Sequence, residues 1–113
     1  MRKLQFAALA AAVALVPALA FANAVTVTKT GKSGQPIGLI FIFNCQNHLL
    51  PGSAYGSALH GKVTVNKTTR DVCFGKGEPV LEFIYTSNPG YKGNDQATLY
   101  IDSQLQNYPV IVQ

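Results

Sequence analysis

The sequence contains two cysteines, and the chemistry that a pair of cysteines can perform depends on their spacing. Cys45 and Cys73 lack the C-x-x-C spacing that redox sites prefer, and a zinc site needs four ligands in clustered pairs. In an oxidising compartment, an even pair of cysteines in a small domain forms one structural disulfide. We therefore predict a Cys45–Cys73 bridge, which closes a loop of roughly 29 residues and contributes about 3.6 kcal/mol in the chain-entropy expression.

The two histidines are the candidates for metal chemistry. His48 and His60 flank a long polar connection, and with Asp71 or Glu78 they could form a mixed-ligand site for copper or zinc. The alternative is that both histidines are solvent-exposed residues near loop ends. We favour that alternative, so we expect no metal and no other cofactor.

Hydrolytic chemistry has weaker support in the sequence. Ser53 and Ser57 have glycine neighbours, but neither lies in the G-x-S-x-G motif of a nucleophile elbow. Glu78 and Glu82 lie four positions apart on an expected strand, which separates them by about 13–14 Å, too far for the carboxylate pair of a glycosidase. We therefore do not expect an enzyme.

The beginning of the chain matches a secretory signal peptide. Residues 2–3 are basic, residues 4–16 form an apolar run, and Ala20-Phe21-Ala22 supplies the small-x-small pattern that a signal peptidase accepts. Cleavage after Ala22 would start the mature chain at Asn23, and cleavage after Ala24 is a second candidate. We expect an exported protein, periplasmic or secreted, that keeps no membrane anchor after cleavage.

Processing also changes the charge of the chain. Nine Lys and Arg residues face five Asp and Glu residues, which gives a net charge of +4. Two of the cations lie in residues 1–22, so the net charge of residues 23–113 is +2 and no basic run remains. This charge argues against a nucleic-acid partner. Residues 23–113 are enough for a single domain.

Short apolar segments separated by turn residues run along the mature chain. Most of them alternate apolar and polar residues with a period of two, and none has the 3.6-residue period of a helix. Six or seven such strands predict an all-β, antiparallel β-sandwich. The expected strands are residues 24–30, 36–44, 60–66, 72–74, 79–86, 95–102 and 108–112.

A long connection is expected between the second and third of these strands. Residues 46–59 contain Gly, Ser, Asn and Pro, and long loops without their own secondary structure are often functional. Loops at the end of a sandwich are where such folds bind partners. We therefore name this connection as the candidate partner-binding loop, with His48, Leu49, Leu50 and Tyr55 as its contact residues.

A turn motif lies between the last long strands. Tyr85, Thr86, Pro89, Gly90, Tyr91, Gly93 and Asp95 give the pattern Tyr-Thr-x-x-Pro-Gly-Tyr-x-Gly-x-Asp. This pattern resembles the signature of bacterial immunoglobulin-like and cadherin-like domains of exported envelope and surface proteins. The Gly-x-Val-x-Val strand at residues 61–65 also looks like that family, so the resemblance covers residues 60–101. Ala97 and Leu99 stand where the family usually has bulkier aromatic residues.

The resemblance implies an immunoglobulin-like sandwich, and it says little about a ligand because such sandwiches serve many functions. The turn residues also have a physical explanation. Pro89 presets φ, Gly90 and Gly93 permit positive φ, and Tyr91 can cap the core. Asp95 can accept hydrogen bonds from nearby backbone N–H groups, and one carboxylate is too few for a calcium site.

These observations favour a small non-enzymatic binding or structural module, expected to be a monomer, with an unidentified protein or envelope partner. Three alternatives stay open. The first is an inhibitor of a secreted hydrolase that uses residues 46–59. The second is a structural subunit that exchanges strands through residues 25–27 and 108–112. The third is a metal-binding protein that uses His48 and His60.

Overall fold

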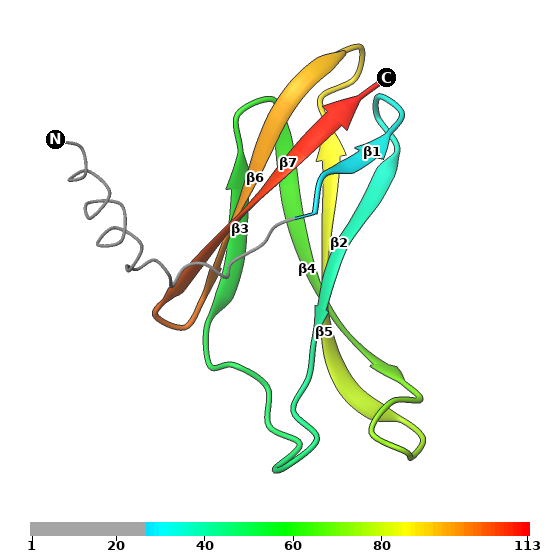
Figure 1. The fold of residues 1–113 in the computed structure, drawn as a ribbon, viewed down its shortest axis with the longest axis vertical. Coiled ribbons are helices and arrows are strands. Elements are labelled where there is room, and N and C mark those ends of the chain that lie inside the picture. Colours follow the sequence, from blue (N-terminus) through cyan, green and yellow to red (C-terminus); the bar gives the residue numbers. More distant parts are fainter. Residues whose placement is uncertain (1–26) are drawn as a thin grey trace, which may run out of the picture.

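Seven strands carry the fold in the computed structural model, which describes residues 27–113 (Figure 1). The predicted signal peptide, residues 1–22, lies outside the described residues. No helix in the described part of the chain is long and apolar enough to cross a membrane. The strands are β1 (Lys29–Gly31), β2 (Pro36–Ile42), β3 (Ala54–Ala58), β4 (Gly61–Arg70), β5 (Glu78–Ser87), β6 (Gly93–Ile101) and β7 (Gln104–Val112).

The strands form two sheets, one of four strands in the order β1-β7-β6-β3 and one of three strands in the order β2-β5-β4. An immunoglobulin sandwich likewise places its second, fifth and fourth strands in one sheet and its seventh, sixth and third strands in the other. The structure therefore confirms an all-β, immunoglobulin-like sandwich with one disulfide. The antiparallel prediction fails at one pair, because β1 runs parallel to β7.

The core lies between the two sheets and follows the predicted period of two. Along β5, Leu81, Phe83 and Tyr85 are buried, and along β6 the buried apolar residues also alternate. Tyr85, Phe83 and Leu99 are among the largest side chains that are fully enclosed. The core cluster comprises Ile37, Leu39, Leu81, Phe83, Tyr85, Ala97, Leu99, Ile101, Tyr108, Val110 and Val112.

The prediction of an unstructured connection at residues 46–59 is wrong in its second half. Ala54–Ala58 forms β3, which pairs antiparallel with β6 at the edge of the four-stranded sheet. Gly56 lies at the centre of this strand, where there is no space for a side chain. A Cβ atom placed on Gly56 would lie 2.6 Å from Val63 Cγ1 and 3.0 Å from the Thr98 carbonyl oxygen.

The prediction of a short strand at residues 72–74 is also wrong. Strand β4 continues to Arg70, and the segment that follows is a turn before β5 begins at Glu78. Cys73 and Phe74 have φ angles of 59° and 60°, which lie in the left-handed region and do not fit a strand.

The turns gather at the two ends of the sandwich. Residues 43–53, residues 71–77 and the β6–β7 turn lie at one end, which we call the disulfide end (Figure 1). The β1–β2, β3–β4 and β5–β6 turns lie at the other, which we call the opposite end (Figure 1). The predicted binding residues and the predicted turn motif therefore fall on different ends of the molecule.

Candidate functional site

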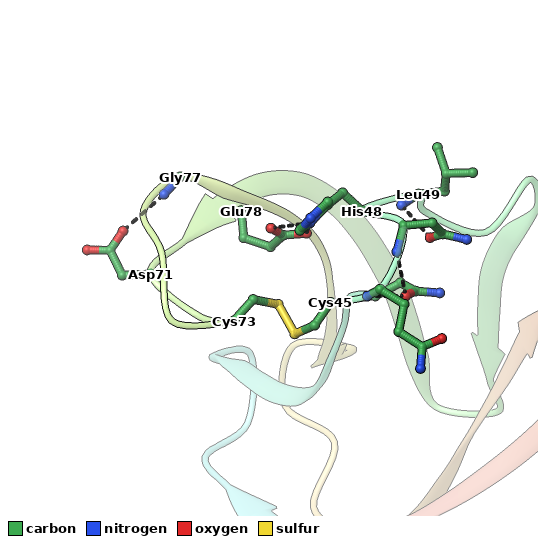
Figure 2. A network of polar contacts seen from close by, with 10 residues as sticks. Cys45, His48, Leu49, Asp71, Cys73, Gly77 and Glu78 are labelled. Atoms are coloured by element: carbon green, nitrogen blue, oxygen red, sulfur yellow. Dashed lines mark hydrogen bonds and ion pairs between the residues drawn. A yellow bond between two sulfur atoms is a disulfide. The ribbon is translucent and has the colours of Figure 1, made fainter.

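A disulfide joins the two long loops at the disulfide end. Cys45 follows β2 and Cys73 lies between β4 and β5, with their Cα atoms 5.3 Å apart (Figure 2). Both cysteines of the chain are used in this bond. The bond lies outside the packed core. It links two loops that are not paired with each other through any strand. Its effect is therefore to hold residues 43–53 against residues 71–77.

A hydrogen bond makes a second connection, between the first loop and the start of β5. His48 Nδ1 donates to the Glu78 carboxylate, at 2.8 Å from Oε1 and 2.9 Å from Oε2 (Figure 2). Glu78 is buried at the first position of β5, whereas more than half of the His48 side chain is exposed. A buried carboxylate needs a partner, so His48 is held over Glu78.

Asparagine side chains fix the first of these loops locally. Asn44 Oδ1 accepts hydrogen bonds from the backbone N–H groups of Gln46 at 2.8 Å and Asn47 at 3.2 Å. Asn47 Oδ1 accepts from the N–H of Leu49 at 2.9 Å. Asn side chains stabilise turns in this way because their oxygen replaces a backbone acceptor. These hydrogen bonds define the turns of residues 44–49.

Two aspartates hold the neighbouring turns. The Ser53 N–H donates to Asp102 Oδ1 at 3.1 Å and the Asp102 N–H donates to the Ser53 carbonyl at 2.8 Å, which ties the loop to the β6–β7 turn. In the other loop, Asp71 Oδ1 accepts from the Gly77 N–H at 3.1 Å (Figure 2). Gly77 has a φ of 69°, which glycine adopts without strain.

Several apolar side chains of the two cross-linked loops are exposed to solvent. Phe74 is fully exposed, Leu49 is 66% exposed and Phe43 is 41% exposed. Phe74 directly follows Cys73, and Phe43 lies two positions before Cys45, so the two rings flank the disulfide in sequence. A cleft of about 290 Å³ lies in the first loop. It is lined by Ile42, Phe43, Asn44, Asn47, Leu49, Leu50, Pro51 and Asp102.

A cation–π contact covers the nearby outer face of the three-stranded sheet. The Arg70 guanidinium lies 3.8 Å from the centre of the Phe41 ring. Arg70 lies opposite Glu78 in the strand pairing, and Phe41 lies opposite Glu82. Val80 lies midway between these two glutamates on the same face of β5, so the contact between Arg70 and Phe41 passes over Val80. Val80 is fully buried even though it faces away from the main core.

The predicted turn motif forms a hydrogen-bonded cluster around Asp95 at the opposite end. Asp95 accepts from the Tyr85 hydroxyl at 2.6 Å and from the backbone N–H groups of His60 at 2.9 Å, Leu59 at 3.3 Å and Gln96 at 2.7 Å. Burial alone would raise the pKa of Asp95, but these hydrogen bonds hold it below its usual value. Burial, and then the bond to Asp95, raises the pKa of Tyr85.

The remaining motif residues shape the β5–β6 turn. Gly90 and Gly93 have φ angles of 85° and 131°, as their positions in the motif predict. Tyr91 stacks on the His60 ring with centroids 4.1 Å apart, and its hydroxyl donates to the Asn94 carbonyl. Pro89 lies in the same turn. These contacts are internal, which fits a structural turn.

The structure separates some of the predicted contact residues. His48, Leu49 and Leu50 lie at the disulfide end, but Tyr55 lies on β3, where its ring stacks on Tyr100 with centroids 4.7 Å apart. The assignment of Tyr55 to one loop with the other three is therefore wrong, because β3 interrupts that loop.

The hypothesis of a metal site shared by both histidines is also wrong. His48 contacts Glu78 at the start of β5, whereas the His60 carbonyl accepts from the N–H of Asn88, just beyond the end of β5. A strand of this length spans about 30 Å, so one ion cannot reach both rings. Within residues 27–113, no group of three or more metal-ligating side chains lies together.

Sequence reasoning missed Phe74, Phe43 and Arg70. The sequence pattern placed Phe74 in a short strand at residues 72–74 and gave no indication that its side chain is exposed. Its position directly after a cysteine in a mostly polar segment was the signal available in the sequence.

Comparison of the chain with protein-family models, with curated protein sequences and with solved structures finds no match. The candidate site is therefore defined by its geometry: two cross-linked loops that present exposed apolar side chains in a fixed arrangement.

Proposed function

We propose that this protein is a non-enzymatic, exported binding module of immunoglobulin-like fold, and that the disulfide end is its contact surface. The observation that carries the proposal is the fully exposed Phe74 ring, which sits on a left-handed backbone next to a disulfide. A non-glycine residue adopts that backbone conformation at a cost. The fold itself gains no burial of Phe74 in return.

Binding would supply that missing burial. Aromatic side chains dominate the energy of protein interfaces when a partner encloses them. Phe74 and Leu49 are both exposed on loops fixed by the disulfide and by the His48–Glu78 pair. Loops that are already ordered lose little conformational entropy when they bind. Little of the free energy gained by burying their apolar side chains is therefore lost to ordering the loops.

Export is the second part of the proposal. It is supported by the signal-peptide pattern of residues 1–22 and by the disulfide, which persists in oxidising compartments. Fractionation of the source cells, followed by N-terminal sequencing of the protein, tests it. We expect the mature protein outside the cytoplasm, starting at Asn23 or Val25, and an unprocessed cytoplasmic protein would contradict export.

The contact surface is tested with three purified, oxidised baits that are used for affinity capture from envelope and culture fractions. The first is the native mature protein and the second carries Phe74→Ser with Leu49→Ser. The third carries Leu59→Ser as a matched control, because Leu59 is 83% exposed and begins the β3–β4 turn at the opposite end. We expect the native and control baits to retain the same partner and the double variant to lose it.

Equal melting temperatures of the three baits ensure that loss of the partner is not loss of the fold. A partner that all three baits retain, or that the control bait also loses, would contradict the disulfide end as the contact surface. A stable bait that captures nothing from either fraction would contradict the binding proposal itself.

Inhibition of a secreted hydrolase is the second candidate function, favoured by the rigidity of the same loops. His48, Cys73 and Phe74 all have φ angles near 60°, and the disulfide and the His48–Glu78 contact connect the segments that carry them. Rigid loops of this kind suit a partner that must be blocked without rearrangement. A captured hydrolase whose activity falls to zero at a 1:1 ratio, and is restored by Phe74→Ser, would select this function.

A further inference from the structure

The outward face of the four-stranded sheet is uncharged. Buried residues alternate along β6 and β7, so every second residue from Asn94 to Tyr100 and from Leu105 to Ile111 points outward. On β3 and β1, the outward residues are those that lie opposite them in the strand pairing. None of the outward residues on these four strands is Asp, Glu, Lys, Arg or His. We call this surface the uncharged face.

The outward face of the three-stranded sheet differs in this respect. It carries Lys62 and Arg70 on β4 and Glu82 on β5. Lys, Arg and Glu are the usual residues of a solvent-exposed surface, because water hydrates their charges. The uncharged face offers neither Coulomb attraction nor a charge-assisted hydrogen bond, so it fits a partner that is itself uncharged.

Two tyrosines stand side by side on the uncharged face. Tyr55 on β3 lies directly opposite Tyr100 on β6, and their rings stack with centroids 4.7 Å apart and planes 18° apart. Leu105 lies opposite Tyr100 on its other side. Tyr55 is 56% exposed, because β3 is an edge strand and Tyr100 covers only one face of the Tyr55 ring. The other face of that ring is therefore open to a ligand.

Hydroxyl and amide groups lie beside the tyrosines. Ser57, Gln96 and Thr98 line part of a hollow of about 340 Å³ on this face. Ser57 and Thr98 lie opposite each other, two residues along their strands from the tyrosine pair, which is a step of about 6–7 Å. Thr98 Oγ1 donates to Asn107 Oδ1 at 2.9 Å, so the NH2 donors of the same Asn107 amide are not used in that bond.

The order of polar and apolar side chains on the uncharged face distinguishes between occupants. A protein interface concentrates apolar side chains at its centre and places polar ones at its rim. Here Ser57, Thr98 and Asn107 form one row across three strands. This row lies between the tyrosine pair and Ile111, so hydroxyl and amide groups interrupt the apolar residues. That order suits a sugar chain, whose C–H faces pack on aromatic rings and whose hydroxyl groups both donate and accept hydrogen bonds.

We propose that the uncharged face binds a neutral β-linked glycan, with one sugar ring against the open face of Tyr55 and the next sugars over the hollow beside Ser57 and Gln96. Packing against an aromatic ring requires a sugar face that carries only C–H bonds. Glucose and N-acetylglucosamine present such faces in β-linked chains, because their hydroxyl and acetamido groups lie at the rim of each ring. The ligand class is therefore a cellulose-type or chitin-type chain.

NMR titration of the isotope-labelled mature protein with cellohexaose and with chitohexaose tests the inference. We expect at least one of the two to shift the amide signals of Tyr55, Ser57 and Thr98, and the responses to the two identify the sugar. Thr64 and Thr68 lie on the other sheet, so their signals should not move. Polygalacturonate is the anionic control. No shift with either neutral hexasaccharide at millimolar concentrations, or tighter binding of polygalacturonate, would overturn the inference.

Substitutions separate ligand binding from the structural role of the tyrosine pair. Tyr55→Leu keeps an apolar side chain beside Tyr100 but removes the ring, so it should weaken the affinity for the glycan roughly ten-fold, or about 1.4 kcal/mol. Tyr55→Phe keeps the ring and should bind like the native protein. Gln96→Ala should also weaken binding, whereas Asn66→Ala is its matched control, because Asn66 is exposed on the other sheet. Native affinity in both Tyr55→Leu and Gln96→Ala would overturn the inference, and melting temperatures verify that each variant is folded.

Sedimentation of the native protein tests the other occupant of this face, a second copy of the chain. We expect a monomer at the concentrations of the titration. Dimers that dissociate in Tyr55→Leu would mean that the face is an interface between copies, and would overturn the inference. These outcomes are independent of the proposed function, because the capture experiment depends on Phe74 and Leu49 at the disulfide end, which none of these variants changes.

Discussion

The Tyr85 hydroxyl donates a hydrogen bond of 2.6 Å to Asp95, and both side chains are buried at the opposite end of the sandwich. Tyr85 belongs to β5 and Asp95 to β6, so the bond connects the two sheets. The same carboxylate also holds the β3–β4 turn through the backbone of Leu59 and His60. Asp95 therefore joins three parts of the chain that are distant in sequence.

We expect this bond to contribute measurably to the free energy of unfolding. Tyr85→Phe should lower it by about 1–2 kcal/mol, because the carboxylate keeps its backbone donors. Asp95→Asn should lower it by about 2–3 kcal/mol. The new amide NH2 group is a donor, so it cannot accept the hydrogen bonds that one carboxylate oxygen accepts from its O–H and N–H partners. Urea unfolding of both variants and of the double variant gives the coupling energy, and strict additivity would contradict a direct interaction.

Stability should fall in acid because of Asp95. Its pKa is lower in the folded protein than in the unfolded chain, where an Asp titrates near about 3.9. The unfolded state therefore binds the proton first, and the stabilisation that is present above about pH 4 is lost as the pH falls through the folded-state pKa. Urea titrations between about pH 2 and 7 measure the loss. Asp95→Asn serves as the control, and an equally steep decline in that variant would assign the effect to other carboxylates.

Loss of the disulfide should destabilise the fold and loosen the disulfide end selectively. Cys45→Ser with Cys73→Ser should lower the free energy of unfolding by about 3.6 kcal/mol, the loop-closure value for this separation. Hydrogen exchange should accelerate at residues 46–49 and 75–77 before it accelerates in β5 and β6. A uniform acceleration across the molecule would show that the bond stabilises the core rather than the loops.

Gly61 should not tolerate a methyl group. A Cβ atom on Gly61 would lie 2.5 Å from the Thr86 carbonyl oxygen and 2.8 Å from Ser87 Cα, and both are backbone atoms that cannot rotate away. We expect Gly61→Ala to cost about 1–3 kcal/mol in thermal or urea unfolding. Gly38→Ala is the matched control in a strand, since nothing lies within 4 Å of its Cβ position, and it should be close to neutral.

The Arg70–Phe41 contact should stabilise the hairpin of β4 and β5 through both charge and packing. Arg70→Met keeps most of the aliphatic chain over Val80 and should cost about 0.5–1 kcal/mol, the size of an exposed cation–π contact. Arg70→Ala also uncovers Val80 and should cost more. Thermal unfolding of the two variants compares these effects, and equal losses would mean that the Arg70 chain does not cover Val80.

Local patterns in the sequence predicted the parts of the fold that bury large alternating side chains. Leu81, Phe83 and Tyr85 define the inward face of β5 by their period alone, and Leu99 does the same for β6. The disulfide followed from the count of cysteines, and the role of Asp95 followed from its place after Gly93. In each case residue type and local pattern were enough for the prediction, although the disulfide and the contacts of Asp95 join residues that are distant in sequence.

The tertiary structure alone decided where the small, exposed and distant residues lie. Strand β3 has no apolar alternation of its own and exists because β6 offers it a paired edge. His48 and His60 flank a single connection in the sequence, but β3 carries them to opposite ends of the sandwich. Phe74 is exposed in a loop whose Cys73 is bonded to Cys45, 28 residues away. Pairings between distant segments set these features, and local side-chain periodicity carries no information about them.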